Sequence, residues 1–424
     1  MTRARDAGES RRFWRISRAG IFFQGGAAAV DTSTIVAALV HGLTGSALAV
    51  GAAAAISRYG WLFPQIFVAY LAQRRARRMV FYKVGAFGRA GCLAALTVLL
   101  AAAGALPHDM LVVLFFMLWT AYSFIGGIVA VPYNDIVARS IPSDRRSRML
   151  AVRFFGGGIL ALAVAAAAHY FLNLEGLPFP TGYAVIVAFG AVLMLASSLS
   201  FISAGESDAP LPARPSHGFV GFLADGMAVF RDDQRFRLFI YAQWLGGAVT
   251  MAFPFYILQA SVLTGGVPGG FSGVAFLLGA STAGALASNG LWGWWGDRFG
   301  KRSLYEGVTL LRIAPPLLIL ALAAWGGPGA SSALPGLALV FILLGALGNG
   351  ITIAMLGYLM EISPDDRRPA YSGYFNAMVA PAALLPLAGA VIVEAASLQA
   401  VFAASLMAAV LQFLAVRRLR RAAS

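Results

Sequence analysis

The sequence predicts an all-α polytopic membrane protein with twelve transmembrane helices, arranged as two parallel six-helix repeats. Three observations support this fold class. The 424 residues are 59% hydrophobic, have a mean hydropathy of +0.76, and include only 12% charged residues, against about 25% in a soluble domain. A dozen apolar stretches reach the roughly 20 residues that cross a bilayer. Among the connections between these stretches, only every second one contains Lys or Arg. This composition excludes a soluble enzyme, a secreted protein and a disulfide scaffold.

The polar breaks between the apolar stretches define the individual elements. They separate two groups of six, which predicts an N-terminal bundle over 1–204 and a C-terminal bundle over 236–424. The predicted spans are 19–41, 46–72, 79–105, 110–138, 150–172, 181–203, 236–260, 271–295, 303–326, 335–360, 370–393 and 397–416.

The segment 205–235 joins the two bundles and differs from them in composition. It contains Pro210, Pro212 and Pro215. Apolar side chains then recur at helical spacing, namely Phe219, Phe222, Leu223, Met227 and Phe230. The segment is therefore predicted to be a cytoplasmic linker that ends in a short amphipathic helix on the membrane surface.

The distribution of positive charge indicates the orientation of the chain. Basic residues cluster at both termini and in every second connection, and the intervening connections contain no Lys or Arg. Because basic loops remain in the cytoplasm, both termini are expected there. The net charge of +14 then reflects contact with the lipid bilayer, and no nucleic-acid partner is expected. An Arg-rich start that runs into a full span indicates an uncleaved first helix. We expect a monomer in a bacterial inner membrane.

The sequence offers no pattern typical of an enzyme. Cys92 is the one cysteine, which excludes an internal disulfide and a cysteine metal site. The four histidines are scattered, and there is no zinc-ligand spacing, no paired carboxylates and no phosphate-binding glycine loop. We therefore expect no enzymatic activity, no cofactor and no metal.

An internal repeat supports the division into two halves. Tyr82 and Arg89 in the third span recur as Tyr305 and Arg312 in the ninth, 223 residues later in both cases. Parallel repeats of this kind place a substrate site near the bilayer midplane between them. The 48 glycines are interpreted first as close-packing positions between helices, with a hinge at 156–158 as the alternative.

A loop motif carries a more specific resemblance. After the eighth span the chain reads Gly293-Trp-Trp-Gly-Asp297-Arg298-Phe-Gly300-Lys301-Arg302. This resembles the loop signature of the major facilitator superfamily. The resemblance implies a secondary transporter that works by alternating access, with Asp297, Arg298 and Arg302 in a cytoplasmic latch next to Glu361. Charge-assisted hydrogen bonds at a helix end can hold two helices in one arrangement, although a simple headgroup anchor is the alternative.

The corresponding loop of the first half departs from the signature. It reads Leu71-Ala-Gln73-Arg74-Arg75-Ala-Arg77-Arg78 and has no acid where Asp297 stands in the second half. Asp135 in the fourth span is the candidate substitute for this acid. Without it, the loop is a basic headgroup anchor.

Two charges near the bilayer midplane are the strongest site candidates, because ionisable groups are costly at that depth. Asp31 lies about twelve residues from the cytoplasmic end of the first span, and Arg58 lies about twelve residues from the outer end of the second. The pair is expected to meet, with Asp31 as the proton-carrying group or as a static partner of Arg58. Neighbours at helical spacing predict a polar cavity wall, formed by Gln24 and Thr34 in the first helix and Trp61 and Gln65 in the second.

The residues from Asp31 to Leu39 also resemble a signature in the first span of proton-coupled drug antiporters of this superfamily. One residue is inserted, the expected Asn and Pro are missing, and the antiporter motif of the fifth span is absent. Drug export is therefore a minority alternative.

Arg89 and Arg312 allow two interpretations. Their duplication favours a structural role in each repeat, and their long side chains can extend toward the surface. The alternative is attraction of an anionic substrate, since three arginines stand near the midplane against one acid. Such an excess suits a carboxylate or a phosphate.

Other polar residues within the helices can line the cavity or bridge helices, and bridging is the more common outcome. For the second half we predict that Gln243, Tyr256 and Asn376 line the cavity, because the seventh and eleventh helices do so in the family that the chain resembles.

The leading functional prediction is a secondary active transporter for a small organic solute, with an anionic solute as one option, coupled to protons through Asp31. One alternative is an assembly factor or receptor that has a transporter fold and no transport activity. Another is a flippase for a lipid or amphiphile. A polar central chamber would favour transport, and a chamber filled by apolar side chains would favour the assembly role.

Overall fold

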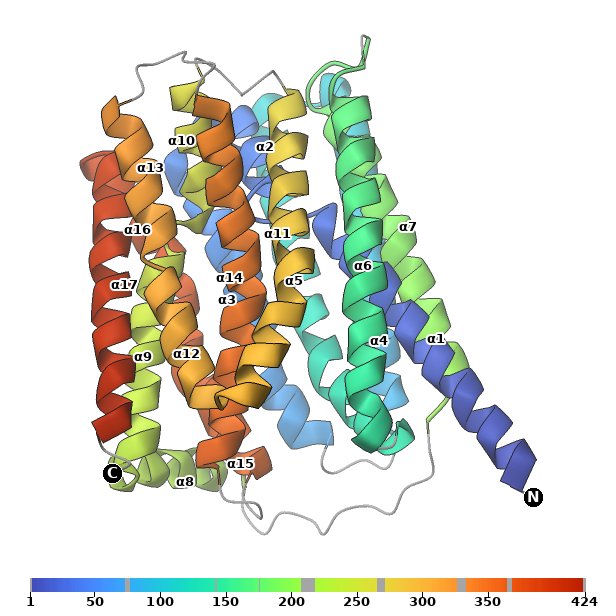
Figure 1. Ribbon diagram of the computed structural model, residues 1–424. Helices are drawn as coiled ribbons and strands as arrows, with labels where there is room; N and C mark the ends of the chain where they lie inside the picture. The colour runs from blue at the N-terminus through green and yellow to red at the C-terminus, as the bar shows by residue number, and fades with distance from the viewer. Residues whose placement is uncertain are drawn as a thin grey trace. The chain divides into compact units, whose positions relative to one another are not determined.

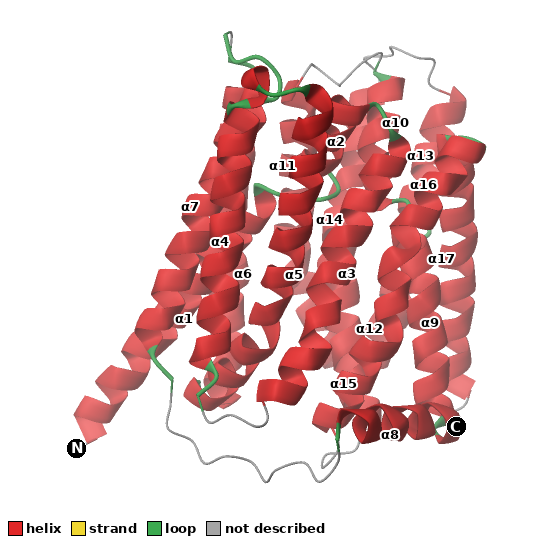
Figure 2. Cartoon of the chain, turned by 180° about the vertical axis from the view of Figure 1, so that it is seen from behind, coloured by secondary structure: helices red, strands yellow, loops and turns green. Residues whose placement is uncertain are grey.

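The computed structural model describes residues 2–72, 77–141, 143–174, 176–206, 218–264, 271–325, 333–363 and 368–421. Within these ranges the chain is helical with short connections and contains no strand (Figure 2). The α-helices are α1 (Thr2–Ala28), α2 (Ile35–Thr44), α3 (Ala47–Ala72), α4 (Met79–Ala101), α5 (His108–Ser140), α6 (Ser143–Leu172), α7 (Thr181–Ala204), α8 (Phe219–Asp232), α9 (Gln234–Thr250), α10 (Tyr256–Leu263), α11 (Phe271–Arg298), α12 (Lys301–Leu311), α13 (Ala314–Trp325), α14 (Ala333–Ile362), α15 (Arg368–Val379), α16 (Leu385–Ala395) and α17 (Leu398–Arg421). Short 3₁₀ turns are η1 (Ala103–Ala105), η2 (Phe253–Phe255) and η3 (Ala380–Leu384).

The helices confirm the predicted all-α membrane architecture. Within the described ranges, ten segments are long and apolar enough to cross a membrane, and they correspond to the third through twelfth predicted spans. The second predicted span is the continuous 26-residue helix α3. The first is divided between α1 and α2. The protein is a multi-pass membrane protein.

Proline divides three of the predicted spans into two helices each. Pro254 lies in η2 between α9 and α10, Pro315 and Pro316 lie at the start of α13, and Pro381 lies in η3 between α15 and α16. Proline has no N–H and its ring clashes with the preceding turn, so it interrupts the helical hydrogen-bond ladder. Hydropathy does not register these breaks, because the apolar composition continues through them.

The chain forms two compact units. The first unit comprises Met1–Asp31 and Ile56–Ser216, and the second comprises Thr32–Ala55 and His217–Ser424. In the first unit α1 packs on α6 and α7, and α4 packs on α5 and α7 (Figure 1). In the second unit α11 packs on α14, and α9 and α13 pack on α17. The predicted bundles, 1–204 and 236–424, describe the two sequence repeats, and these boundaries stay a prediction. As packed, the second unit also includes residues 32–55.

Glycines allow the closest helix contacts within each unit. A Cβ on Gly156 would lie 2.7 Å from Ile21 Cδ1, and a Cβ on Gly157 would lie 2.6 Å from Gln24 Cβ, so both face α1. In the second unit, a Cβ on Gly345 would lie 1.8 Å from Ser281 O. The packing interpretation of the glycine-rich segment at 156–158 is thereby confirmed for Gly156 and Gly157.

The predicted amphipathic helix is present as α8. It lies across the end of α9 (Figure 1) and contacts α9 and α15. Gly226 of α8 seats against Tyr374 of α15, where a Cβ would lie 2.6 Å from Tyr374 Cδ1. The linker prolines Pro210, Pro212 and Pro215 lie outside the described residues.

Candidate functional site

Asp31 lies in a break between two helices, and this corrects the prediction that it shares a helical face with Gln24 and Thr34. Helix α1 ends at Ala28, and α2 begins at Ile35. Between them the hydrogen bonds are turn-like: Val30 N donates to Ala27 O at 3.2 Å and Asp31 N donates to Ala28 O at 3.3 Å. The segment reads Asp-Thr-Ser-Thr, and all four side chains compete with the backbone for its hydrogen bonds, which disfavours a helix. Asp31 is half-buried and Thr34 is fully buried.

Helix α3 presents Arg58, Trp61 and Gln65 at the predicted spacing on an unbroken helix. Arg58 and Trp61 are exposed, whereas Gln65 is buried and its Nε2 donates to Trp61 O at 2.7 Å. The ring of Trp61 lies 6.5 Å from that of Phe23 in α1. The proposed pairing of Asp31 with Arg58 stays a prediction.

The two repeated arginines have different surroundings. Arg312 is buried, with Nη1 donating to Gln412 Oε1 at 2.7 Å and Nη2 donating to Gly246 O at 3.2 Å. Arg89 is also buried, but its guanidinium lies over the ring of Phe23, with 4.9 Å between Cζ and the ring centroid. Arg312 thus bridges neighbouring helices by hydrogen bonds, whereas Arg89 makes a cation–π contact. Attraction of an anionic substrate by these two residues stays a prediction.

The cavity residues predicted for the second half are mostly enclosed by protein. Gln243 is buried and its Nε2 donates to the Tyr305 hydroxyl at 2.9 Å, so it bridges α9 and α12. Tyr256 is 1% exposed and packs on Phe402, with 4.8 Å between ring centroids. Asn376 in α15 is half-buried. A cavity of about 30 Å³, the size of one water molecule, is lined by residues that include Tyr256, Arg312 and Ile351.

In the first unit Asp135 has the position expected of the missing acid. Its carboxylate forms an ion pair with Arg78, the last residue of the basic loop, and a second with Arg139 Nε at 2.9 Å. Glu206, which the sequence did not single out, accepts hydrogen bonds from Arg78 N at 2.9 Å and Met79 N at 3.0 Å and so caps α4. Loop residues 73–76 lie outside the described part of the chain.

In the second unit the signature motif has a different pairing from the one predicted. Asp297 Oδ1 pairs with Lys301 Nζ at 2.8 Å, and the Asp297 side chain is 80% exposed. Arg298 and Glu361 are exposed, and Arg302 is half-buried with Nη2 lacking a hydrogen-bond partner among the residues described. The latch formed by Asp297 with Arg298, Arg302 and Glu361 stays a prediction.

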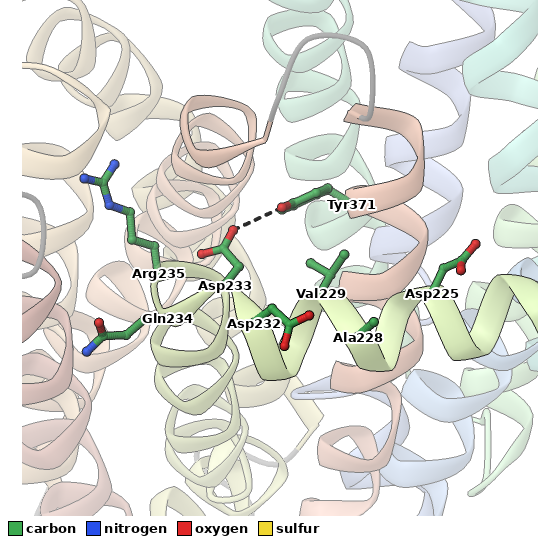
Figure 3. A pocket seen from close by; sticks show the side chains of 8 residues that line it. All are labelled: Asp225, Ala228, Val229, Asp232, Asp233, Gln234, Arg235 and Tyr371. Carbon is green, nitrogen blue, oxygen red and sulfur yellow. Dashed lines mark hydrogen bonds between the residues drawn. The ribbon is translucent and has the colours of Figure 1, made fainter.

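A cleft of about 610 Å³ lies where α8 meets α9 and α15 (Figure 3). Its lining includes Asp225, Asp232, Asp233, Arg235 and Tyr371. Tyr371 donates to Asp233 Oδ2 at 3.0 Å, and the other carboxylate oxygen of Asp233 accepts from Phe236 N at 3.0 Å and caps α9. No predicted site residue lines this cleft, and its polar groups hold the linker helix in place.

The described residues contain no group of three or more His, Cys, Asp or Glu side chains able to hold a metal ion. Polar side chains between helices mainly bridge neighbours instead. Ser197 donates to Ala19 O at 2.7 Å, and Ser200 donates to Arg15 O at 2.9 Å. Asn349 donates to Asn289 Oδ1 at 3.0 Å.

Comparison with known proteins extends this description. The family model for the Major Facilitator Superfamily matches residues 266–424. No curated protein sequence matches the chain. Solved transporter structures are similar in fold over nearly its whole length. They include a mutant of the nucleoside transporter NupG (TM-score 0.71, 13% identity, 96% of this chain and 99% of that chain), a bacterial homologue of the iron transporter ferroportin in the inward-facing state (0.65, 12%, 96% and 98%) and a POT family transporter in complex with 5-aminolevulinic acid (0.68, 12%, 97% and 95%).

The matched family segment contains the signature motif at 293–302, and the fold similarity covers both units. The second half of the chain from residue 266 onward thus matches the family model of the Major Facilitator Superfamily, and the fold over nearly the whole chain is similar to that of solved transporters.

Proposed function

We propose that the protein is a secondary active transporter that moves a small organic solute by alternating access and couples this movement to protons through Asp31. The observation that carries the proposal is the position of Asp31. It occupies a non-helical break about halfway along the first span, in a chain whose fold is that of transporters.

A broken helix at membrane depth suits this role. Unwound backbone is tolerated there only where protein or a water-filled cavity can satisfy its polar groups. In such a break the backbone N–H and C=O groups released from the helical ladder lie next to the carboxylate and can also bind a solute or an ion. Burial raises the proton affinity of a carboxylate and a neighbouring cation lowers it, so a change in its surroundings during transport can drive uptake and release of a proton.

Proteoliposomes with a pH-sensitive dye in the lumen test the proposal. A panel of small carboxylates, phosphate esters, nucleosides and peptides is added from outside, and we expect a change in lumen pH with the transported member. Asp31→Asn should abolish this change while solute binding persists. Asp109→Asn, which neutralises an exposed carboxylate at the start of α5, is the matched control and should behave as wild type.

Two results would contradict the proposal. If a bound solute is carried with no proton movement in the wild type, the protein is not proton-coupled. If Asp31→Asn keeps solute-driven proton movement at the wild-type level, the coupling group lies elsewhere, and Asp135 and Glu361 are the next candidates.

A further inference from the structure

Two arginines of the first unit lie against one aromatic ring. The guanidinium Cζ of Arg89 in α4 lies 4.9 Å from the centroid of Phe23, and that of Arg153 in α6 lies 5.5 Å from the same centroid. Arg89 is 2% exposed and Arg153 is half-buried. Each lies ten residues from the N-terminal residue of its helix, or about 15 Å along the helix axis. Two like charges therefore share a small, largely buried region of one bundle.

Among the described residues, neither arginine has an acidic partner. No ion pair in the described part of the chain involves Arg89 or Arg153, and the Nε atom of each is buried without a hydrogen-bond partner. The acids of this unit whose contacts are described have other partners, and Glu9 lies 4.0 Å from Arg145. Asp135 pairs with Arg78 and Arg139, and Glu206 caps α4.

The contacts of the described residues do not compensate for one buried and one half-buried positive charge. Leaving a buried charge uncompensated costs more free energy than a cation gains by lying over an aromatic face. In the described ranges, one hydrogen bond runs from the pair, from Arg153 Nη1 to the Tyr133 hydroxyl at 3.0 Å. An anion placed between the two guanidinium groups would supply the missing charge.

The second repeat contains a buried arginine whose guanidinium is hydrogen-bonded to the protein. Arg312, which follows Arg89 by 223 residues, donates to Gln412 and to Gly246 O. Gly246 follows Phe23 by the same 223 residues. At this repeat position the second half has the Gly246 carbonyl, which accepts a hydrogen bond from Arg312. The first half has the Phe23 ring, which makes a cation–π contact with Arg89 and no hydrogen bond. Among the described residues, the first-half arginine Arg89 has a buried Nε without a hydrogen-bond partner, whereas its second-half counterpart Arg312 is hydrogen-bonded.

The side chain of Arg153 is held in place along its length. Its aliphatic part crosses Gly20 of α1, where a Cβ would lie 2.5 Å from Arg153 Cγ. Its head is fixed by Phe23 and Tyr133. The cation is therefore positioned before any ligand arrives, which lowers the entropy lost on binding.

From this geometry we infer that Arg89 and Arg153, with the hydroxyl of Tyr133, bind the carboxylate or phosphate group of the transported solute. The inference rests on the proposed transport function, and it assigns an anionic substrate class to it. Guanidinium groups donate paired hydrogen bonds that match both anions. The Tyr133 hydroxyl accepts from Arg153 and keeps its own proton to donate to the ligand.

Thermal unfolding of the purified full-length protein in detergent tests the site without a membrane or a proton gradient. Sodium phosphate and sodium succinate are the anionic probes, and sodium chloride and choline chloride at equal ionic strength are the controls. We expect phosphate, succinate or both to raise the unfolding temperature of the wild type above the controls, and the stronger effect identifies the preferred group. Arg89→Gln and Arg153→Gln should each lose this rise. Lys83→Gln, which removes an exposed cation from α4, should retain it.

Two further variants keep the test decisive if a glutamine variant fails to fold. Tyr133→Phe retains the ring and removes one donor, and it should weaken the binding of the effective anion by about tenfold, the equivalent of one hydrogen bond. Arg89→Lys retains the charge without the paired donors and should also weaken binding. Without added anion, Arg89→Gln should unfold at or above the wild-type temperature, because it removes an unpaired buried charge.

The inference is overturned if the wild type shows no anion-specific rise. It is also overturned if the Arg89 and Arg153 variants keep the rise that Lys83→Gln shows, since the arginines then have structural roles only. Binding is measured here without transport, so a failure of proton coupling through Asp31 would leave this result intact.

Discussion

At the scale of single residues, Arg312 illustrates how a cation is stabilised inside a membrane bundle. Gln412 accepts from Arg312 at 2.7 Å and donates its own amide to Ala242 O at 3.1 Å. The amide therefore connects α9, α12 and α17 through one buried network. Removing one member leaves the others without partners, and that desolvation penalty is the main cost.

We predict that Gln412→Leu lowers the stability of the protein by about 2 kcal/mol, because it leaves part of the buried Arg312 guanidinium unbonded. The measurement is thermal or denaturant unfolding in detergent. Gln234→Leu, an exchange at an exposed position, is the control and should change little. Equal stability of the two variants would show that Arg312 does not depend on Gln412.

Asp135 provides a second prediction at this scale. Asp135→Asn removes the partner of Arg78, whose side chain is 6% exposed, and should cost about 2 kcal/mol, less than a fully buried pair because Asp135 is partly solvated. Asp232→Asn removes an exposed pair with Arg231 and should cost less than about 0.5 kcal/mol. Comparison of the two unfolding temperatures checks this prediction. A similarly small loss of stability in both variants would show that Asp135 makes only a surface contact at the level of the lipid headgroups.

The candidate site was predictable from sequence only in part. Asp31 and Arg89 stand out because charge is rare in apolar segments. Arg153 was missed because the predicted fifth span began at 150, which placed it in the headgroup region, whereas α6 begins at Ser143. Hydrogen-bond partners such as Gln412 depend on which helices become neighbours, and hydropathy contains no information about that.

At the scale of elements, α11 and α14 approach each other through two glycines. A Cβ on Gly284 would lie 2.1 Å from Ile342 O, and a Cβ on Gly345 would lie 1.8 Å from Ser281 O. In both cases the obstacle is backbone, which cannot rotate away. Small residues are the main route to close helix contact in lipid, where hydrophobicity does not drive helices together.

Gly345→Ala should therefore separate α11 from α14 and strongly reduce the yield of folded protein. Gly293→Ala in α11 is the matched control, because nothing lies within 4 Å of a Cβ built there. That variant should be neutral or slightly stabilising, by up to about 1 kcal/mol, since alanine favours a helix over glycine. Monodispersity of both variants on size exclusion gives the readout, and a normal yield of Gly345→Ala would refute the close contact.

Element positions were predicted well and element continuity poorly. A long apolar run is an unambiguous signal for a span, so all twelve segments contain helix where expected. Whether a span is one helix or two depends on local backbone chemistry. Proline explains the breaks near Pro254, Pro315 and Pro381. Pro64 and Pro132 lie inside continuous helices, so the presence of proline alone does not predict where a span divides. The break at 29–34 contains no proline and follows from clustered hydroxyl and carboxylate side chains.

At the scale of the whole molecule, the charge pattern predicts orientation. Reporter fusions after residue 424 and within 205–235 should both be cytoplasmic, because the adjoining segments are basic. A fusion within 263–270, a connection with no Lys or Arg, should lie on the opposite side. The measurement uses two reporters at each position, one active only in the cytoplasm and the other active only on the opposite side of the membrane. A non-cytoplasmic signal from either of the first two positions would show that the predicted topology is wrong.

The assignment of residues 32–55 to the second unit has a consequence for synthesis. Glu394 accepts hydrogen bonds from Ser46 Oγ at 3.1 Å and from Leu48 N at 3.0 Å, 346 residues earlier in the chain. At about 5–20 residues per second, the ribosome adds Glu394 roughly 20–70 s after Leu48. The second hydrophobic segment thus enters the membrane long before the residues that cap it exist. During that interval α2 and the start of α3 depend on lipid or on the insertion machinery, and a premature stop codon beyond the first repeat leaves them permanently without their partners.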